Sequence, residues 1–296
     1  MSVAAQGSIG LSSDTLRQLE LMNLKARRAF LGTRSGGHRS LRRGHGIEFS
    51  DYRAYELGDN PRHIDWGVYG RTDKVVVKRF QEEQNLSVLI ILDGSRSMFF
   101  PENDGKWRRA VELVLALAYV ALQQHDTVSV VVPGSYRSPK LNVAASFHHL
   151  TSALNKVGFS ALKTLTEQTA AAAELAKLPG LCITISDFLF EPKDVTTAFA
   201  ALASRGLETH AVRVVSANDR NPFAAAKSGF IARDSESDAR FAVSPDTTKA
   251  YESAFDAHHK DLTQALAKTG TSFGVCAADA PLNETLFKLL PKLGVF

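Results

Sequence analysis

The sequence predicts an α/β protein built on a mostly parallel β-sheet. Short apolar runs rich in β-branched residues recur at 86–92, 127–132, 181–186, 210–215 and 272–277. Segments with helical periodicity separate most of these runs. A continuous apolar run is typical of a strand that is buried on both faces. The alternation of strands and helices therefore indicates right-handed βαβ units with helices packed against the sheet.

The N-terminal part of the chain precedes this alternation. Residues 12–31 are predicted to form an amphipathic helix, with Ser13 or Asp14 as its cap, and residues 32–46 a glycine-rich loop. Residues 47–71 mix aromatic side chains with both signs of charge. Their apolar residues follow neither the period of a helix nor that of a strand. Residues 74–80 alternate as an edge strand does.

The C-terminal part continues the alternation and then departs from it. A short edge strand is predicted at 136–143, and a hairpin with a polar turn at 229–244. Further helices are predicted at 106–124, 147–157, 165–178, 192–204, 246–269 and 282–291.

Composition narrows the class of protein. The 296 residues are 44% apolar and 22% charged, which is ordinary for a globular chain. No apolar run reaches 18 residues, and the N-terminus lacks a signal-peptide pattern. Cys182 and Cys276 both lie in apolar runs, which argues against a disulfide scaffold or a cysteine zinc site. We expect a cytoplasmic protein, with peripheral attachment at the inner membrane left open.

The net charge of +4 is concentrated near the N-terminus. Seven basic and no acidic residues lie between positions 25 and 47, and the remainder of the chain has a net charge of −3. Such a basic arm suits nucleic acid, anionic lipid or an acidic protein. It contains one aromatic residue and no recognisable nucleic-acid motif, so nucleic acid is not favoured.

Two predicted strands end in acidic residues. Asp93 follows the strand at 86–92, with Ser95 and Ser97 two and four residues later, and Asp187 follows the strand at 181–186. Ligands of parallel sheets bind beyond the carboxyl ends of the strands. Oxygen donors of this kind suit Mg²⁺ or Mn²⁺ and not zinc. Alternatively, Asp-Gly-Ser forms a simple turn, and Asp93 caps the next helix.

With a threonine from the loop before the second strand, these residues would resemble the metal-ion-dependent adhesion site of von Willebrand factor A domains. Thr164 and Thr166 are both candidates, and the resemblance favours Thr164. It implies that a divalent ion, Mg²⁺, Mn²⁺ or Ca²⁺, is surrounded by Asp93, Ser95, Ser97, Thr164 and Asp187. The chain departs from the family at Leu162-Lys163, where the family usually has glycine.

A second resemblance covers the chain from about residue 40 to its end. The block from Gly46 to Trp66, followed by Arg71, is similar to the signature of the bacterial family called domain of unknown function 58. Arg233–Ser237 and Tyr251 are similar to its tail. The resemblance implies a three-layer, Rossmann-like A-type domain. It also implies a chaperone-like adaptor that works beside a MoxR-type AAA+ ATPase and binds an acidic residue of a client protein.

The same block carries closely spaced opposite charges. Arginine pairs bidentately with carboxylates, so we expect a buried ion-pair network with Tyr52, Tyr55 and Trp66 packed around it. We interpret it as a structural clamp. Its members are Glu48, Asp51, Arg53, Asp59, Arg62, Asp65 and Arg71.

We find no complete catalytic constellation in the sequence. A phosphate-transferring hydrolase with Asp93 as nucleophile needs a second aspartate where Ser95 stands. There is no Walker P-loop, GxSxG or HExxH motif. Adjacent histidines at 148–149 and 258–259 diverge on a helix, so solvent exposure is expected for them. Two alternatives to the adaptor stay open: a metal-dependent phosphoester hydrolase, and nucleic-acid binding through the basic N-terminal arm.

We therefore expect three segments. Residues 1–46 form an N-terminal helix and basic arm, and residues 47–80 a signature segment packed on the sheet. Residues 81–296 form the A-type domain with an added hairpin and helices at its C-terminal end.

Overall fold

The chain divides into two compact units. A computed structural model describes residues 8–24, 48–81, 86–160, 164–175, 180–222, 231–233, 240–242 and 245–296. The smaller unit spans Thr33–Gln84, and the larger one combines Met1–Gly32 with Asn85–Phe296. The basic arm and the predicted loop at 32–46 lie outside the described residues. Among the described helices, none is long and apolar enough to cross a bilayer.

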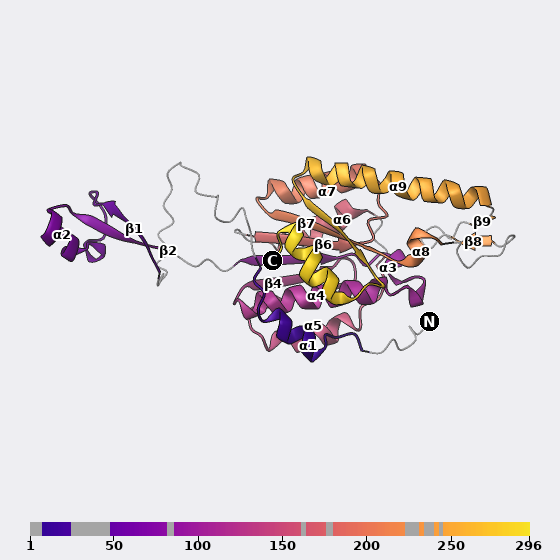
Figure 1. Ribbon diagram of the computed structural model, residues 1–296, viewed down its shortest axis with the longest axis horizontal. Helices are drawn as coiled ribbons and strands as arrows, with labels where there is room; N and C mark the ends of the chain where they lie inside the picture. Colours follow the sequence, from indigo (N-terminus) through magenta and orange to yellow (C-terminus); the bar gives the residue numbers. More distant parts are fainter. Residues whose placement is uncertain are drawn as a thin grey trace. The chain divides into compact units, whose positions relative to one another are not determined.

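The larger unit is built on a six-stranded sheet of order β10-β7-β6-β3-β4-β5 (Figure 1). Its strands are β3 (Ser87–Leu92), β4 (Thr127–Val132), β5 (Tyr136–Arg137), β6 (Gly180–Ser186), β7 (Glu208–Val215) and β10 (Ser272–Ala277). All pairings are parallel except that of the edge strand β5 with β4. The mostly parallel sheet is thus confirmed.

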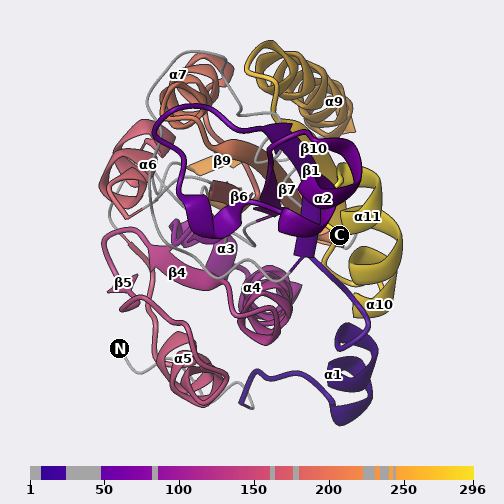
Figure 2. The same cartoon turned by 90° about the vertical axis from the view of Figure 1, so that its left-hand side faces the viewer.

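Helices cover both faces of this sheet (Figure 2). Alternate residues of β3 enter different cores: Val88, Ile90 and Leu92 face one, and Leu89 and Ile91 the other. The first core is covered by α1 (Ser13–Leu19), α4 (Lys106–Gln123), α5 (Ser146–Leu154) and the C-terminal helices. The second is covered by α6 (Leu165–Ala173), α7 (Pro192–Ser204) and α9 (Pro245–Lys268). The larger unit is a three-layer α/β arrangement.

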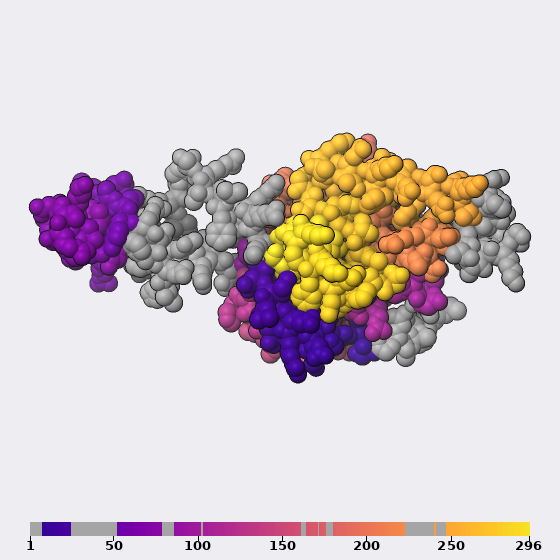
Figure 3. Space-filling view, viewed as in Figure 1, coloured from indigo at the N-terminus to yellow at the C-terminus, as the bar shows by residue number. Residues whose placement is uncertain are grey.

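Short elements complete the larger unit. The predicted hairpin is present as β8 (Ile231–Arg233) antiparallel to β9 (Arg240–Ala242). The remaining elements are α3 (Arg96–Phe99), η2 (Glu102–Asp104), α8 (Ala217–Arg220), α10 (Leu282–Glu284), the π-helix η3 (Thr285–Leu289) and α11 (Leu290–Leu293). The C-terminal helices lie beside α1, yellow against indigo in Figure 3.

The predicted helix at 12–31 ends earlier than expected. Helix α1 stops at Leu19, and residues 25–31 of the predicted helix lie outside the described part. The backbone N–H of Leu24 donates to the Gln124 side chain, 2.8 Å away, and Asn23 accepts from the same amide. These long-range bonds to the end of α4 divert the chain from the helical path.

The described part of the smaller unit, residues 48–81, contains a two-stranded antiparallel ribbon and two short helices. Strand β1 (Glu48–Ala54) pairs with β2 (Val76–Gln81). Between them lie η1 (Pro61–His63), capped by Asn60, and α2 (Trp66–Thr72), capped by Asp65. Each cap side chain accepts backbone N–H bonds, which explains why the two helices begin where they do.

Candidate functional site at the carboxyl end of the sheet

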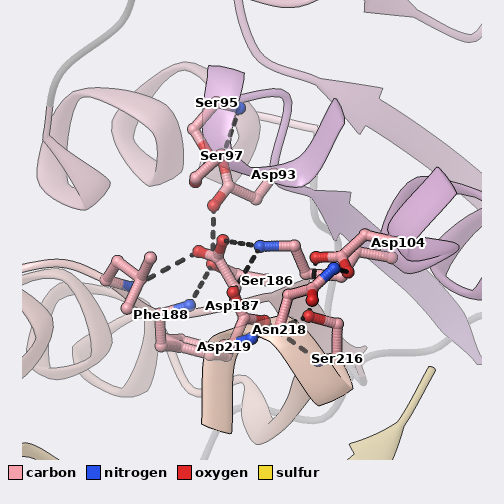
Figure 4. A network of polar contacts seen from close by, with 12 residues as sticks. Asp93, Ser95, Ser97, Asp104, Ser186, Asp187, Phe188, Ser216, Asn218 and Asp219 are labelled. Carbon is pink, nitrogen blue, oxygen red and sulfur yellow. Dashed lines mark hydrogen bonds and ion pairs between the residues drawn. The ribbon is translucent and has the colours of Figure 1, made fainter. Parts of the chain in front are cut away.

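The two predicted acidic loops lie side by side. Strands β3 and β6 are parallel neighbours with Leu92 opposite Ile185, and the Asp93 N–H donates to the Ile185 carbonyl at 2.9 Å. Asp93 and Asp187 therefore both follow the carboxyl ends of adjacent strands, as the sequence predicted. We call Asp93, Ser95, Ser97 and Asp187 the rim (Figure 4).

Asp93 is fully buried, and both of its carboxylate oxygens accept hydrogen bonds from neighbouring protein groups. Its Oδ1 accepts from the Ser95 N–H at 2.8 Å and from the Gln168 amide at 3.2 Å. Its Oδ2 accepts from the Ser186 hydroxyl at 2.6 Å. Burial, together with the nearby charge of Asp187, raises the pKa of Asp93 to about 6. A carboxylate held in this way is not presented to a substrate as a nucleophile.

The Asp93–Ser97 turn is compact for a steric reason. The bond from Ser95 N–H to Asp93 closes an Asx turn. A Cβ at Gly94 would stand 2.8 Å from Cγ1 of Val132, so this position requires glycine. Ser95 and Ser97 are buried, and their Oγ atoms lie 3.0 Å apart. The turn thus brings two hydroxyl oxygens together next to a buried carboxylate.

Asp187 is neutralised by a buried lysine that sequence reasoning missed. Lys106, the first residue of α4, is 2% exposed. Its Nζ lies 3.3 Å from Oδ2 of Asp187 and 2.8 Å from Oδ1 of Asp219. Burial lowers the pKa of Lys106, but the charges of the two aspartates outweigh it and raise the pKa above its ordinary value. One sequence feature could have identified Lys106: it is a cation at the start of a predicted helix, where the helix dipole disfavours a positive charge.

Arg213 supplies a second buried cation. Its Nε donates to the Asp187 carbonyl at 3.0 Å, and its guanidinium stacks 4.7 Å from the Phe255 ring centroid. Burial lowers the pKa of Arg213. A charged residue within the apolar run of β7 was the available sequence signal. With Lys106, it places two positive charges behind the rim.

Asp219 is held rigidly in place to meet Lys106. It forms a capping box with Ser216 at the start of α8, where the Ser216 N–H donates to Oδ2 at 2.9 Å. Ser216 in turn donates to Asp104 at 2.6 Å. Figure 4 shows these side chains beside Asp187. The lysine is therefore anchored from two elements, the loop after β6 and helix α8.

Thr164 has a different local role. It caps α6, and its Oγ1 accepts from the Glu167 N–H at 3.2 Å. Thr166 donates to Asp194. Gln168, from the same helix, is the residue that contacts Asp93. Leu162 and Lys163, where the chain departs from the A-domain pattern, lie outside the described residues.

A cavity of about 400 Å³ opens beside the loop that follows Asp187. Thr164 lines it together with Leu189, Phe190, Glu191, Pro192, Asp194 and His258.

The predicted exposure of the histidine pair at 258–259 is wrong, because His258 is half-buried and its Nε2 lies 2.9 Å from the Phe188 carbonyl. His148 and His149 are exposed as expected.

The donors at the rim partly fit a divalent ion. Asp93, Ser95 and Ser97 offer the oxygen chemistry that Mg²⁺ prefers, and the buried Oε1 of Gln168 has no hydrogen-bond partner among the described residues. Across the described ranges, no group of three or more histidine, cysteine or acidic side chains is placed to hold a metal. The Lys106 ammonium, which pairs with Asp187 at 3.3 Å, would repel a divalent ion bound beside it, because like charges repel strongly where water is excluded.

The charged network of the smaller unit is only partly buried, contrary to expectation. The side chains of Arg53 and Asp59, 2.7 Å apart, are 30% and 11% exposed. Asp65 pairs with Lys78 at 3.1 Å and accepts from the Tyr52 hydroxyl at 2.9 Å. Hydrogen bonds from Lys78 and Tyr52 lower the pKa of Asp65 to about 2.

Other residues that the sequence assigned to this network or its surroundings are exposed or lie outside the described side chains. Trp66 does not pack around it: it is 64% exposed and meets Tyr69 edge-on at 6.0 Å. Arg62 and Arg71 are exposed on η1 and α2. The side chains of Glu48 and Asp51 lie outside the described ones. Glu56, which the sequence reading omitted, pairs with Arg53 at 2.9 Å.

Comparison with known proteins identifies the family. The profile described as "Protein of unknown function DUF58" matches residues 51–262. The chain belongs to this family. Uncharacterised proteins of Mycobacterium bovis and Mycobacterium tuberculosis are 22% identical over 262 residues, covering 85% of this chain and 81% of theirs. The DUF58 match includes the rim and most of the smaller unit's network.

Two solved structures share a weak likeness with this DUF58 chain. One is the conserved hypothetical protein BatB from Bacteroides thetaiotaomicron, with a TM-score of 0.38 and 16% identity, covering 63% of this chain and 99% of its own. The other is an aerotolerance-related membrane protein from Bacteroides fragilis, with a TM-score of 0.39 and 16% identity, covering 61% and 100%. Scores this low support no conclusion about fold or function.

Proposed function

We propose that this DUF58 protein is a protein-interaction adaptor whose larger unit is of the von Willebrand factor A type. Its docking site is the rim, and its partners are a MoxR-type AAA+ ATPase and a client protein that offers an acidic residue. The adaptor would act in the assembly or maturation of other proteins. The observation that carries the proposal is the buried Asp93–Ser95–Ser97 cluster beside Asp187 at the carboxyl end of the sheet.

The state of the carboxylates supports binding more than catalysis. Both oxygens of Asp93 accept internal hydrogen bonds, and Asp187 is paired with Lys106. A general base or nucleophile needs a free lone pair within reach of substrate. The hydrolase alternative therefore has less support than the adaptor.

A divalent ion would be held by Asp93, Ser95 and Ser97. When bound, it would supply a positive charge that an acidic side chain of the client could approach. The cavity beside Asp187 adds apolar surface, because Leu189 on its wall is half exposed. An apolar patch with a few convergent polar groups is the usual composition of a binding site.

Binding to the MoxR-type ATPase of the same genome tests the proposal. We expect the Ser95→Ala/Ser97→Ala double variant to bind the purified ATPase roughly tenfold more weakly, a loss of about 1.4 kcal/mol. Ser204→Ala is the matched control, because Ser204 is exposed at the end of α7. Equal affinity of wild type, double variant and control, in biolayer interferometry with and without a chelator, would remove the rim from the docking site.

A further inference from the structure

Lys106 occupies the position beside Asp187 that a cation would take. Its Nζ approaches Oδ2 of Asp187 at 3.3 Å and Oδ1 of Asp219 at 2.8 Å, and the side chain is buried. We propose that this ammonium group is the resident cation of the rim and suppresses divalent-ion binding by the free chain. The inference depends on the proposed function in one respect only, the location of the divalent-ion site.

The location of Lys106 requires an explanation of its own. The first turn of a helix carries the positive end of the helix dipole, so a cation there is disfavoured by the helix itself. The two carboxylates offset this cost and the cost of burial. Asp219 is fixed by its capping box with Ser216, so the ammonium cannot leave without breaking a second anchored contact.

Local charge leads to the same conclusion. The rim and its surroundings contain four carboxylates, from Asp93, Asp104, Asp187 and Asp219, and two cations, Lys106 and Arg213. A divalent ion that entered this cluster would compete with the Lys106 ammonium for Asp187 and would be repelled by both cations.

Metal titration of the full chain tests this inference. Mn²⁺ and Mg²⁺ are titrated by calorimetry into wild type, Lys106→Met and Lys106→Arg. We expect Lys106→Met to bind Mn²⁺ roughly tenfold or more tightly than wild type, equivalent to about 1.4 kcal/mol or more. Lys106→Arg, which keeps the charge, should bind as weakly as wild type. The gain should disappear when Asp93→Ala is added.

The possible outcomes separate this inference from the proposed function. If wild type and Lys106→Met bind equally well and Asp93→Ala abolishes both, the rim holds metal and Lys106 does not suppress it. If none of the variants binds, both the suppression by Lys106 and the proposed use of a metal are overturned.

A second variant controls for the possibility that Lys106→Met misfolds. Lys106→Met leaves Asp187 and Asp219 without their cation, whereas Lys106→Met/Asp219→Asn removes one of the two charges. Thermal unfolding with and without Mn²⁺ gives a second measure, because a ligand that binds only the folded state raises the melting temperature. We expect an upward shift for the double variant and none for Asp219→Asn alone. Equal shifts for both would overturn the proposal.

Discussion

The hydroxyl of Ser186 donates a 2.6 Å hydrogen bond to Oδ2 of Asp93 and so joins the ends of two adjacent strands. Both groups are fully buried, and the Ser186 Oγ also accepts from the Phe188 N–H at 2.7 Å. This bond fixes the Asp93 turn relative to the loop that carries Asp187. The geometry of the rim therefore depends on Ser186, which lies just before one of its members.

Ser186→Ala should destabilise the protein by about 1–3 kcal/mol, because it leaves a buried carboxylate oxygen without its donor. Urea unfolding measures the change. Ser204→Ala removes an exposed serine hydroxyl and should alter the free energy of unfolding by less than about 0.5 kcal/mol. Equal values for the two variants would mean that the Ser186 bond does not hold the rim together.

Lys106→Met should cost about 3–5 kcal/mol of stability, because breaking a buried ion pair leaves charges uncompensated. The matched control is Arg108→Met, two residues away on the same helix. Arg108 pairs with Glu112 at 3.1 Å but is exposed, so its loss should cost less than about 1 kcal/mol. Both values come from chemical denaturation at neutral pH. A Lys106→Met cost no larger than the control would contradict the anchored pair.

The two cysteines should resist thiol reagents in the folded protein. Cys182 and Cys276 are buried, and burial raises the pKa of Cys182 to about 12. Only the thiolate reacts, so Ellman's reagent at mildly alkaline pH should label neither residue until denaturant is added. Rapid labelling of Cys182 before denaturation would show that β6 opens locally and that its burial is incomplete.

Asp65 should make the smaller unit sensitive to acid. Its pKa is lowered from 3.8 to about 2, so its ionised form stabilises the fold above pH 3.8, and this contribution is lost as pH falls through about 2. Asp65→Asn should remove that pH dependence. Fluorescence of the adjacent Trp66, in a Trp107→Phe background, reports the transition. Identical acid transitions with and without Asp65 would refute its role.

Most of the larger unit could be predicted because its signals are local. The run at 86–92 is apolar at every position but Ser87, and β3 occupies Ser87–Leu92 with both faces buried. The helix expected at 106–124 is α4, Lys106–Gln123. Buried strands and long helices carry their periodicity within a single segment, so no tertiary information was needed to place them.

Parts of the site could not be predicted because they depend on distant residues. Gln168 reaches Asp93 across 75 positions, and Lys106 reaches Asp219 across 113. No local motif links Gln168 to Asp93 or Lys106 to Asp219. The extent of Trp66 exposure likewise depends on how a short mixed segment folds, and the charge pattern alone suggested burial.

Hydrogen–deuterium exchange of the full chain, alone and with the purified MoxR-type ATPase that we propose as its partner, tests the central claim most directly. The account predicts that protection on binding concentrates in residues 93–99 and 187–190, and that Ser95→Ala/Ser97→Ala reduces it. Protection confined to other segments, such as 48–81, with these two unchanged, would show that the rim is not the docking site.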